Sequence, residues 1–136
     1  MIDHLCNFMI FWYGAYGIQF AVAPQFVIDM NYNYGKPLES LFIQVARVMG
    51  GMMLSVCYLI FSTADKKTLM PFITLLNVVV TILGPIWGLF IAEQMNEIPM
   101  KKEMATFIPA GIMVALSVVS LMSMSPAPAA KTKKGK

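Results

Sequence analysis

Four apolar stretches, each of about twenty residues, constrain this chain more than any other feature of its sequence. They cover residues 4–23, 40–62, 69–91 and 104–124, and the only charged residue inside them is Arg47. A helix rises 1.5 Å per residue, so about twenty residues cross the ~30 Å hydrocarbon core of a bilayer. The sequence therefore predicts an all-α fold, a four-helix transmembrane bundle with the helices running up and down.

The composition agrees with this prediction and excludes other classes. Hydrophobic residues make up 58% of the chain and charged residues 12%, whereas a soluble domain is about 25% charged. The basic residues lie at the ends of the apolar stretches and in the tail, with no stripe interleaved with aromatic residues, so we expect no nucleic-acid partner. Residues 125–136 are rich in Pro and Ala and then in Lys, and we expect a disordered tail after a single transmembrane domain of residues 1–124.

The connections between the stretches predict how the bundle is oriented. Residues 25–36 contain turn-forming Asn and Gly and are expected to form a loop after Pro24, and four spans place both termini on one side of the membrane. The turn at Lys66 and Lys67 and the tail bring six lysines to that side, against three lysines on the other. The positive-inside rule then places the termini in the cytoplasm, or in the matrix or stroma of an organelle.

The stretch 40–62 carries its polar and small residues on one helical stripe. At ~100° per residue the stripe contains Ser40, Gln44, Arg47, Gly51, Ser55, Tyr58 and Ser62. Helices in lipid turn polar and small residues toward other helices, so this stripe is expected to be the packed face. The opposite stripe, with Val45, Met49 and Met52, is then expected to contact acyl chains.

Arg47 is the most distinctive single residue of the sequence. It lies seven residues into its span, ~10 Å below the membrane boundary, where an unpaired guanidinium is costly. Several carboxylates follow from the same side, and Glu93, just after the third span, is the expected partner in a structural ion pair. Two alternatives stay open: Arg47 contacts lipid phosphate, or it forms an anion site.

Glycines mark the expected helix contacts, because small residues allow backbones to approach closely. The glycines assigned to helix packing are Gly14, Gly17, Gly50, Gly51, Gly84 and Gly88. In the first span the Gly14 and Gly17 face is expected to pack inward, and the bulky face with Trp12 and Tyr16 to meet lipid or a partner. Pro85 is expected to kink the third span.

The sequence contains no catalytic constellation that we could identify. The spans lack a carboxylate pair, a Ser-His-Asp set and a zinc-binding spacing, so neither a catalytic nor a metal site is predicted. Cys6 and Cys57 are expected to be packing residues, and His4 an interfacial residue, near one membrane face. Residues that could ligate a pigment magnesium are His4, Asn7, Gln19, Gln44, Asn77, Glu93 and Gln94. Hydrogen bonds between helices are the favoured role of the amides, so no cofactor is predicted, and lipid or pigment contacts stay open.

The second span carries a short motif, Arg47-Val48-Met49-Gly50-Gly51-Met52-Met53-Leu54. With the preceding Ala23-Pro24 and a polar connection, it resembles small four-span membrane proteins, grouped as uncharacterised families, that carry an R-x-x-G-G-x-x-L type signature on their second helix. The resemblance covers roughly residues 5–90. It implies a four-helix membrane fold and no particular activity.

These observations favour a non-enzymatic accessory subunit of a larger membrane complex, photosynthetic or respiratory, whose partners are the bilayer and other membrane subunits. The alternative is a small transporter, or a lipid- or anion-binding membrane protein that uses Arg47.

Overall fold

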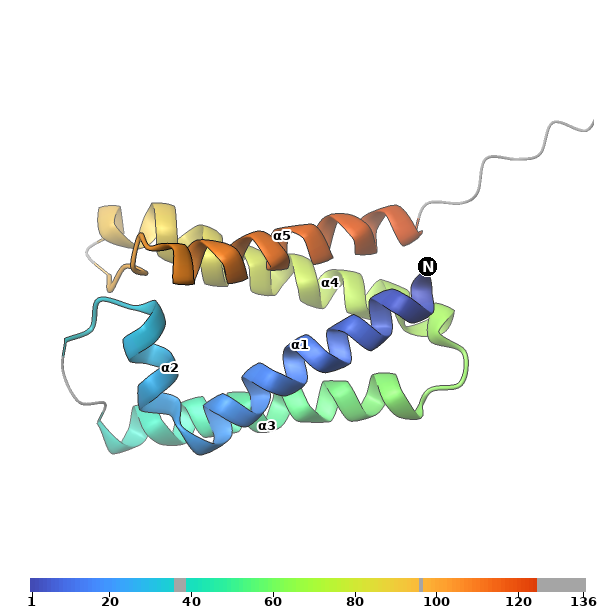
Figure 1. Ribbon diagram of the computed structural model, residues 1–136, viewed down its shortest axis with the longest axis horizontal. Helices are drawn as coiled ribbons and strands as arrows, with labels where there is room; N and C mark the ends of the chain where they lie inside the picture. The colour runs from blue at the N-terminus through green and yellow to red at the C-terminus, as the bar shows by residue number, and fades with distance from the viewer. Residues whose placement is uncertain (36–38, 96, 125–136) are drawn as a thin grey trace, which may run out of the picture.

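The fold is a four-helix bundle of two layers (Figure 1). The computed structural model describes residues 1–35, 39–95 and 97–124, so the predicted tail lies outside the described residues. One layer contains α1 (Ile2–Val22) and α3 (Ser40–Ser62), and the other contains α5 (Met104–Met124) and α4 (Met70–Thr81), which continues as η2 (Ile82–Ile91).

Four helical segments are long and apolar enough to cross a membrane: Ile2–Val22, Ser40–Ser62, Lys66–Met95 and Met104–Met124. The structure is 86% helical, and the described residues contain no strand. The start of α1 and the end of α5 lie at the same end of the bundle (Figure 1). The prediction of an all-α, four-helix transmembrane fold is confirmed, and the chain is an integral membrane protein with several spans.

The connection after α1 is not the predicted loop, because residues 24–31 form a further helix, α2 (Pro24–Asn31). Pro24 occupies the first turn, where a missing N–H costs nothing. Val27 is 1% exposed, and the Asn31 side-chain amide donates to the Val27 carbonyl oxygen at 2.8 Å. Burial of this face against α1, α3 and α5 makes the segment helical. The other connections contain η1 (Lys66–Leu69) and η3 (Ala92–Met95).

Helix α1 crosses the bundle diagonally (Figure 1). At the end with the termini it approaches α4 and α5, and toward its C-terminus it lies on α3. The reason is a contact between two backbones: a Cβ atom at Gly50 would lie 2.6 Å from both the Gly17 carbonyl oxygen and the Ala21 nitrogen. Only glycine at position 50 allows this approach, which draws the second half of α1 toward α3.

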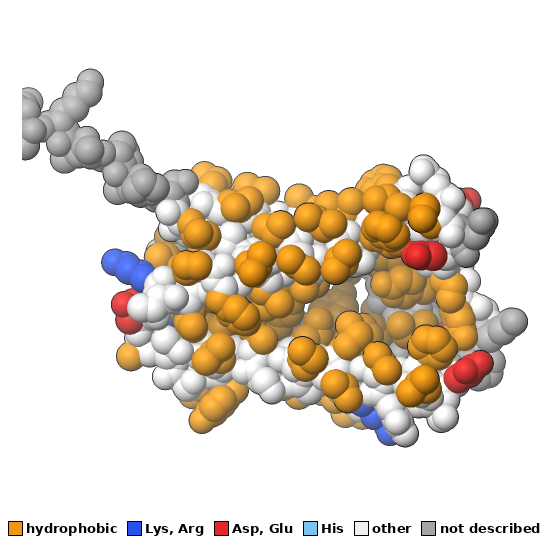
Figure 2. All heavy atoms as spheres, turned by 180° about the vertical axis from the view of Figure 1, so that it is seen from behind, with side chains coloured by type: hydrophobic (Ala, Val, Ile, Leu, Met, Phe, Trp, Pro, Cys, Tyr) orange, Lys and Arg blue, Asp and Glu red, His pale blue; other side chains and the backbone are white. Residues whose placement is uncertain are grey.

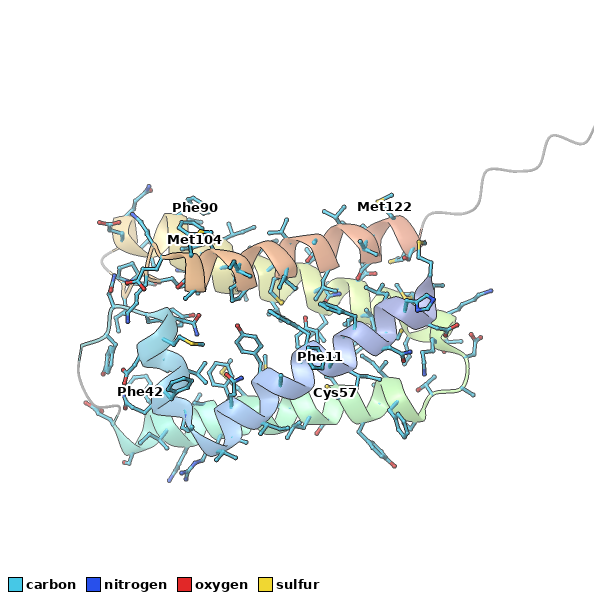
Figure 3. All side chains as sticks on the ribbon, in the orientation of Figure 1. Phe11, Phe42, Cys57, Phe90, Met104 and Met122 are labelled. Atoms are coloured by element: carbon cyan, nitrogen blue, oxygen red, sulfur yellow. The ribbon has the colours of Figure 1, made fainter. Side chains whose placement is uncertain are left out.

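Side chains fill the bundle at the end with the termini, which we call the closed end. Its core comprises Leu5, Cys6, Met9, Tyr13, Cys57, Ile60, Met70, Ile73, Met113 and Leu116. Met9, Ile60 and Ile73 have no exposed surface. Cys57 lies between α1 and α3 (Figure 3), with its sulfur 3.5 Å from the Ile10 carbonyl oxygen. All three spanning segments that meet α1 contribute to this core.

The segment η2 is a π-helix, and its sequence explains why. Pro85 has no N–H to donate to the carbonyl of Thr81, four residues earlier. Ile86 is five residues after Thr81, the spacing of a π turn, and the same spacing is seen at the end of the segment, where the Ala92 N–H bonds the Trp87 carbonyl. The interruption expected at Pro85 thus takes the form of a wider helix.

Candidate functional site: a cavity between the helix layers

At the end opposite the termini the two layers enclose a cavity of about 160 Å³, which we call the interlayer cavity. Its walls come from both layers, from α2 and from the connection before α5. The lining residues are Trp12, Tyr13, Tyr16, Phe20, Val27, Asn31, Tyr32, Met49, Met53, Val80, Gly84, Pro85, Met100, Pro109, Ala110 and Met113. Figure 2 shows a hollow between the layers, on the side of the bundle that faces acyl chains in a membrane.

Three features keep this space open. The second half of α1 lies on α3 and away from the other layer. Gly84 faces the cavity, and a Cβ atom added there would meet no heavy atom within 4 Å. Pro85, next to Gly84, and Pro109 on α5 contribute compact side chains to the cavity wall. The cavity is therefore built by backbone placement and small residues.

Two polar groups on the cavity wall are already bonded to protein atoms. The Tyr13 hydroxyl donates to Asn77 Oδ1 at 2.6 Å, and the Trp12 indole N–H points at the Met113 sulfur at 3.2 Å. The hydroxyls of Tyr16 and Tyr32 make no hydrogen bond with any described residue. Burial raises the pKa of the Tyr32 phenol, so it stays protonated and can donate. Tyr16 and Tyr32 thus bring two phenols, unbonded within the described part of the chain, to a largely apolar wall.

Asn77 organises a buried polar ladder between α1, α4 and α5. Its amide nitrogen donates to Ser120 Oγ at 2.8 Å, and its oxygen accepts from Tyr13. One turn further on, the Thr81 and Ser117 hydroxyls lie 2.9 Å apart. The sequence favoured a hydrogen-bonding role for Asn77 over pigment ligation, and its bonds to Tyr13 and Ser120 agree with that role.

Arg47 and Glu93 are not brought together. The Glu93 carboxylate lies 2.9 Å from Lys102 Nζ, and Arg47 is exposed on α3 with no ion pair or hydrogen bond to a described residue. The expected pair is wrong because α3 packs on α1 and α2, whereas Glu93 belongs to the other layer. The nearby Lys102 satisfies Glu93 instead.

The rotation of α3 also differs from the expectation. The polar stripe through Arg47, Ser55 and Tyr58 is exposed, and the buried residues are Ala46, Gly50, Cys57 and Ile60. Their spacing of four, seven and three residues is a heptad pattern. This pattern in the sequence could have predicted the buried face of α3. The close backbone approach at Gly50 decides the rotation, and the hydroxyl of Ser55 is satisfied within the helix by the Gly51 carbonyl.

The glycines divide into two groups. A Cβ at Gly17 would lie 3.0 Å from Leu54, a Cβ at Gly88 would lie 2.6 Å from the Met100 sulfur, and one at Gly14 would make an ordinary 3.9 Å contact with Cys57. Gly17, Gly50 and Gly88 therefore lie where segments touch. The expectation for Gly51 and Gly84 is wrong, since added side chains there would meet nothing within 4 Å. Gly51 faces outward and Gly84 borders the cavity.

The bulky face of α1, expected to meet lipid or a partner, is divided between the core and the cavity. Met9 has no exposed surface, and Trp12, Tyr16 and Phe20 line the interlayer cavity. Asn7, by contrast, is exposed. Aromatic residues at cavity positions give no sequence signal that distinguishes them from lipid-facing residues, because both environments are apolar.

Within the described ranges, no three His, Cys, Asp or Glu side chains gather where they could hold a metal ion. Comparison of the chain with protein-family models, curated proteins and solved structures found no match. The similarity of the Arg47–Leu54 motif to uncharacterised four-span proteins therefore stays a prediction.

Proposed function

We propose that this chain is a non-enzymatic membrane protein that binds a lipophilic molecule in the interlayer cavity. The observation that carries this proposal is the cavity itself, which has an apolar wall and a side opening between the layers (Figure 2). An apolar cavity of this size excludes water and accepts a ring or a short hydrocarbon segment. The binding role is one of the two that the sequence left open, here at the cavity and not at Arg47.

Energetics favour an occupied cavity. Atoms that line an unfilled space of about 160 Å³ lack partners on one side and lose their dispersion contacts. Acyl chains surround the opening at high concentration, and no described lining residue is charged. A hydrocarbon group that enters the cavity regains the missing dispersion contacts.

Filling the cavity tests the proposal. Gly84→Leu adds a side chain where a Cβ meets nothing, and Gly111→Leu is the matched control, because Gly111 is equally open but lies outside the cavity wall. Both are made in a Trp87→Phe chain, so that Trp12 on the cavity wall is the only tryptophan and can be excited selectively at about 295 nm or above. In vesicles of phosphatidylcholine with brominated acyl chains, we expect Gly84→Leu to protect Trp12 from quenching and Gly111→Leu to leave quenching unchanged. Equal quenching in both would contradict the proposal.

A second candidate function, an accessory subunit of a larger membrane complex, is favoured by the position of Arg47. Its side chain is exposed on α3, as are those of Phe42 and Val48, at a depth where a guanidinium needs an acceptor. A carboxylate of a partner subunit or a lipid phosphate would supply one. If the chain migrates with a large complex in mild detergent and Arg47→Leu abolishes this migration, the result would support the subunit role. If the chain migrates alone with or without the substitution, lipid phosphate would be the favoured partner of Arg47.

The orientation is part of the proposal. The turn with Lys66 and Lys67 lies at the same end of the bundle as the start of α1, and the sequence adds four lysines after residue 124. We infer that this end faces the cytoplasm, or the matrix or stroma. Labelling of Asp65→Cys with a membrane-impermeant thiol reagent from the opposite side would overturn the assignment.

A further inference from the structure

The two ends of the interlayer cavity differ in their hydrogen-bonding state. At the deep end, Trp12 and Tyr13 are bonded to Met113 and Asn77. At the end near α2, the hydroxyls of Tyr16 and Tyr32 have no partner among the described residues. Both phenols border a largely apolar wall, so a ligand atom that accepts hydrogen bonds would gain a contact there that a plain hydrocarbon cannot make.

The two phenols lie nearer to the membrane face than Trp12 does. Tyr16 is six residues before the end of α1, or ~9 Å of helix, and Tyr32 directly follows α2 at the same end of the bundle. From there the apolar wall continues inward to Trp12 and Met113. This order, donors outside and hydrocarbon inside, matches a lipid with its polar end at the membrane face.

The lack of charged residues on the described cavity wall limits which polar group the ligand can carry. No described lining residue is charged, so a carboxylate or phosphate inside the cavity would lose its hydration without gaining a cation. Both phenols can donate to a neutral oxygen. The polar end should therefore be uncharged and carry an acceptor.

We propose that the interlayer cavity selects a neutral lipid with a carbonyl oxygen at its polar end, held by Tyr16 and Tyr32, with its hydrocarbon chain directed toward Trp12. This inference rests on the proposed function, because it specifies the ligand of the same cavity. It adds selectivity for an acceptor-bearing neutral lipid over a plain hydrocarbon or an anion.

Three brominated probes test the inference, with quenching of Trp12 as the readout in the full Trp87→Phe chain in mild detergent. The probes are methyl dibromostearate, which has a neutral ester carbonyl, dibromooctadecane, which has no polar end, and ionised dibromostearate at alkaline pH. We expect the ester to quench at a roughly ten- to hundredfold lower concentration than the hydrocarbon, because each of the two hydrogen bonds should contribute roughly three- to tenfold. The ionised acid should bind more weakly than the ester.

Phenol removal identifies the donors. Tyr16→Phe and Tyr32→Phe should each weaken ester binding by roughly three- to tenfold and leave hydrocarbon binding unchanged. Tyr58→Phe is the matched control, because Tyr58 is 72% exposed on α3 and does not line the cavity. Equal binding of ester and hydrocarbon, tightest binding of the ionised acid, or unchanged ester binding in both phenylalanine variants would overturn the inference while the cavity still binds lipid. Failure of every probe to quench Trp12 would overturn the proposed function with it.

Discussion

The closed end and the cavity end of the bundle are built from the same helices, yet they are packed in opposite ways. At the closed end α1 lies between α3, α4 and α5, and Met9, Ile60 and Ile73 have no exposed surface. At the cavity end α1 has moved onto α3 through the Gly17–Gly50 contact, and a space of about 160 Å³ stays between the layers. The tilt of one helix produces both regions.

The two ends of the bundle differ in how densely they are packed. Side chains interlock and the Asn77 ladder is satisfied at the closed end, so this region fixes the arrangement of the helices. At the cavity end, Pro85 lies in the π-helical segment η2 and Pro109 lies inside α5. π-helical segments are often found at functional sites. A rigid half that supports a hollow half is the division expected of a binding protein.

The largest effect is expected from a change that forces α1 off α3. Gly50→Leu places a side chain against the backbone of α1, where even a Cβ would lie 2.6 Å from Gly17 and Ala21 atoms. Because backbone atoms cannot move aside as side chains do, we expect loss of the cooperative thermal transition in detergent. Gly51→Leu, one residue later and in open space, should retain it; similar behaviour of the two variants would mean that α1 does not touch α3 at Gly50.

A smaller effect on stability is expected from truncating one methionine at each end of the bundle, and the two losses can be compared directly. Met9→Ala empties a fully buried site at the closed end and should lower the free energy of unfolding by about 2–5 kcal/mol. Met53→Ala truncates the same residue type on the cavity wall, where the side chain already borders open space, and should cost about 1 kcal/mol or less. Thermal denaturation in detergent measures both. Equal losses would show that the cavity end is packed as tightly as the closed end.

The smallest effect concerns the polar ladder. Asn77→Leu leaves the Tyr13 and Ser120 hydroxyls without their partner, and we expect a loss of about 1–2 kcal/mol, since hydrogen bonds within membrane bundles are individually modest. Adding Tyr13→Phe removes one stranded hydroxyl and should recover part of that loss. A double-mutant cycle in which the two changes simply add would show that Tyr13 and Asn77 are not coupled.

The sequence by itself determined the four spans, because a bilayer demands about twenty apolar residues per crossing and tolerates few charges between them. It also indicated the interruption at Pro85 and the hydrogen-bonding role of Asn77, since a missing N–H and a buried amide have few structural solutions. Both follow from local chemistry and need no knowledge of the neighbouring helices.

Only the tertiary structure decided how each helix is rotated and what lies between the layers. Lipid and protein interior are both apolar, so hydropathy cannot distinguish Trp12 on a cavity wall from a residue facing acyl chains. Gly50 and Gly51 look equivalent in the sequence, yet one touches α1 and the other faces outward. The partner of Glu93 was likewise settled by the layer to which it belongs. Rotation depends on which backbones approach most closely, and that is a property of pairs of helices distant in the chain.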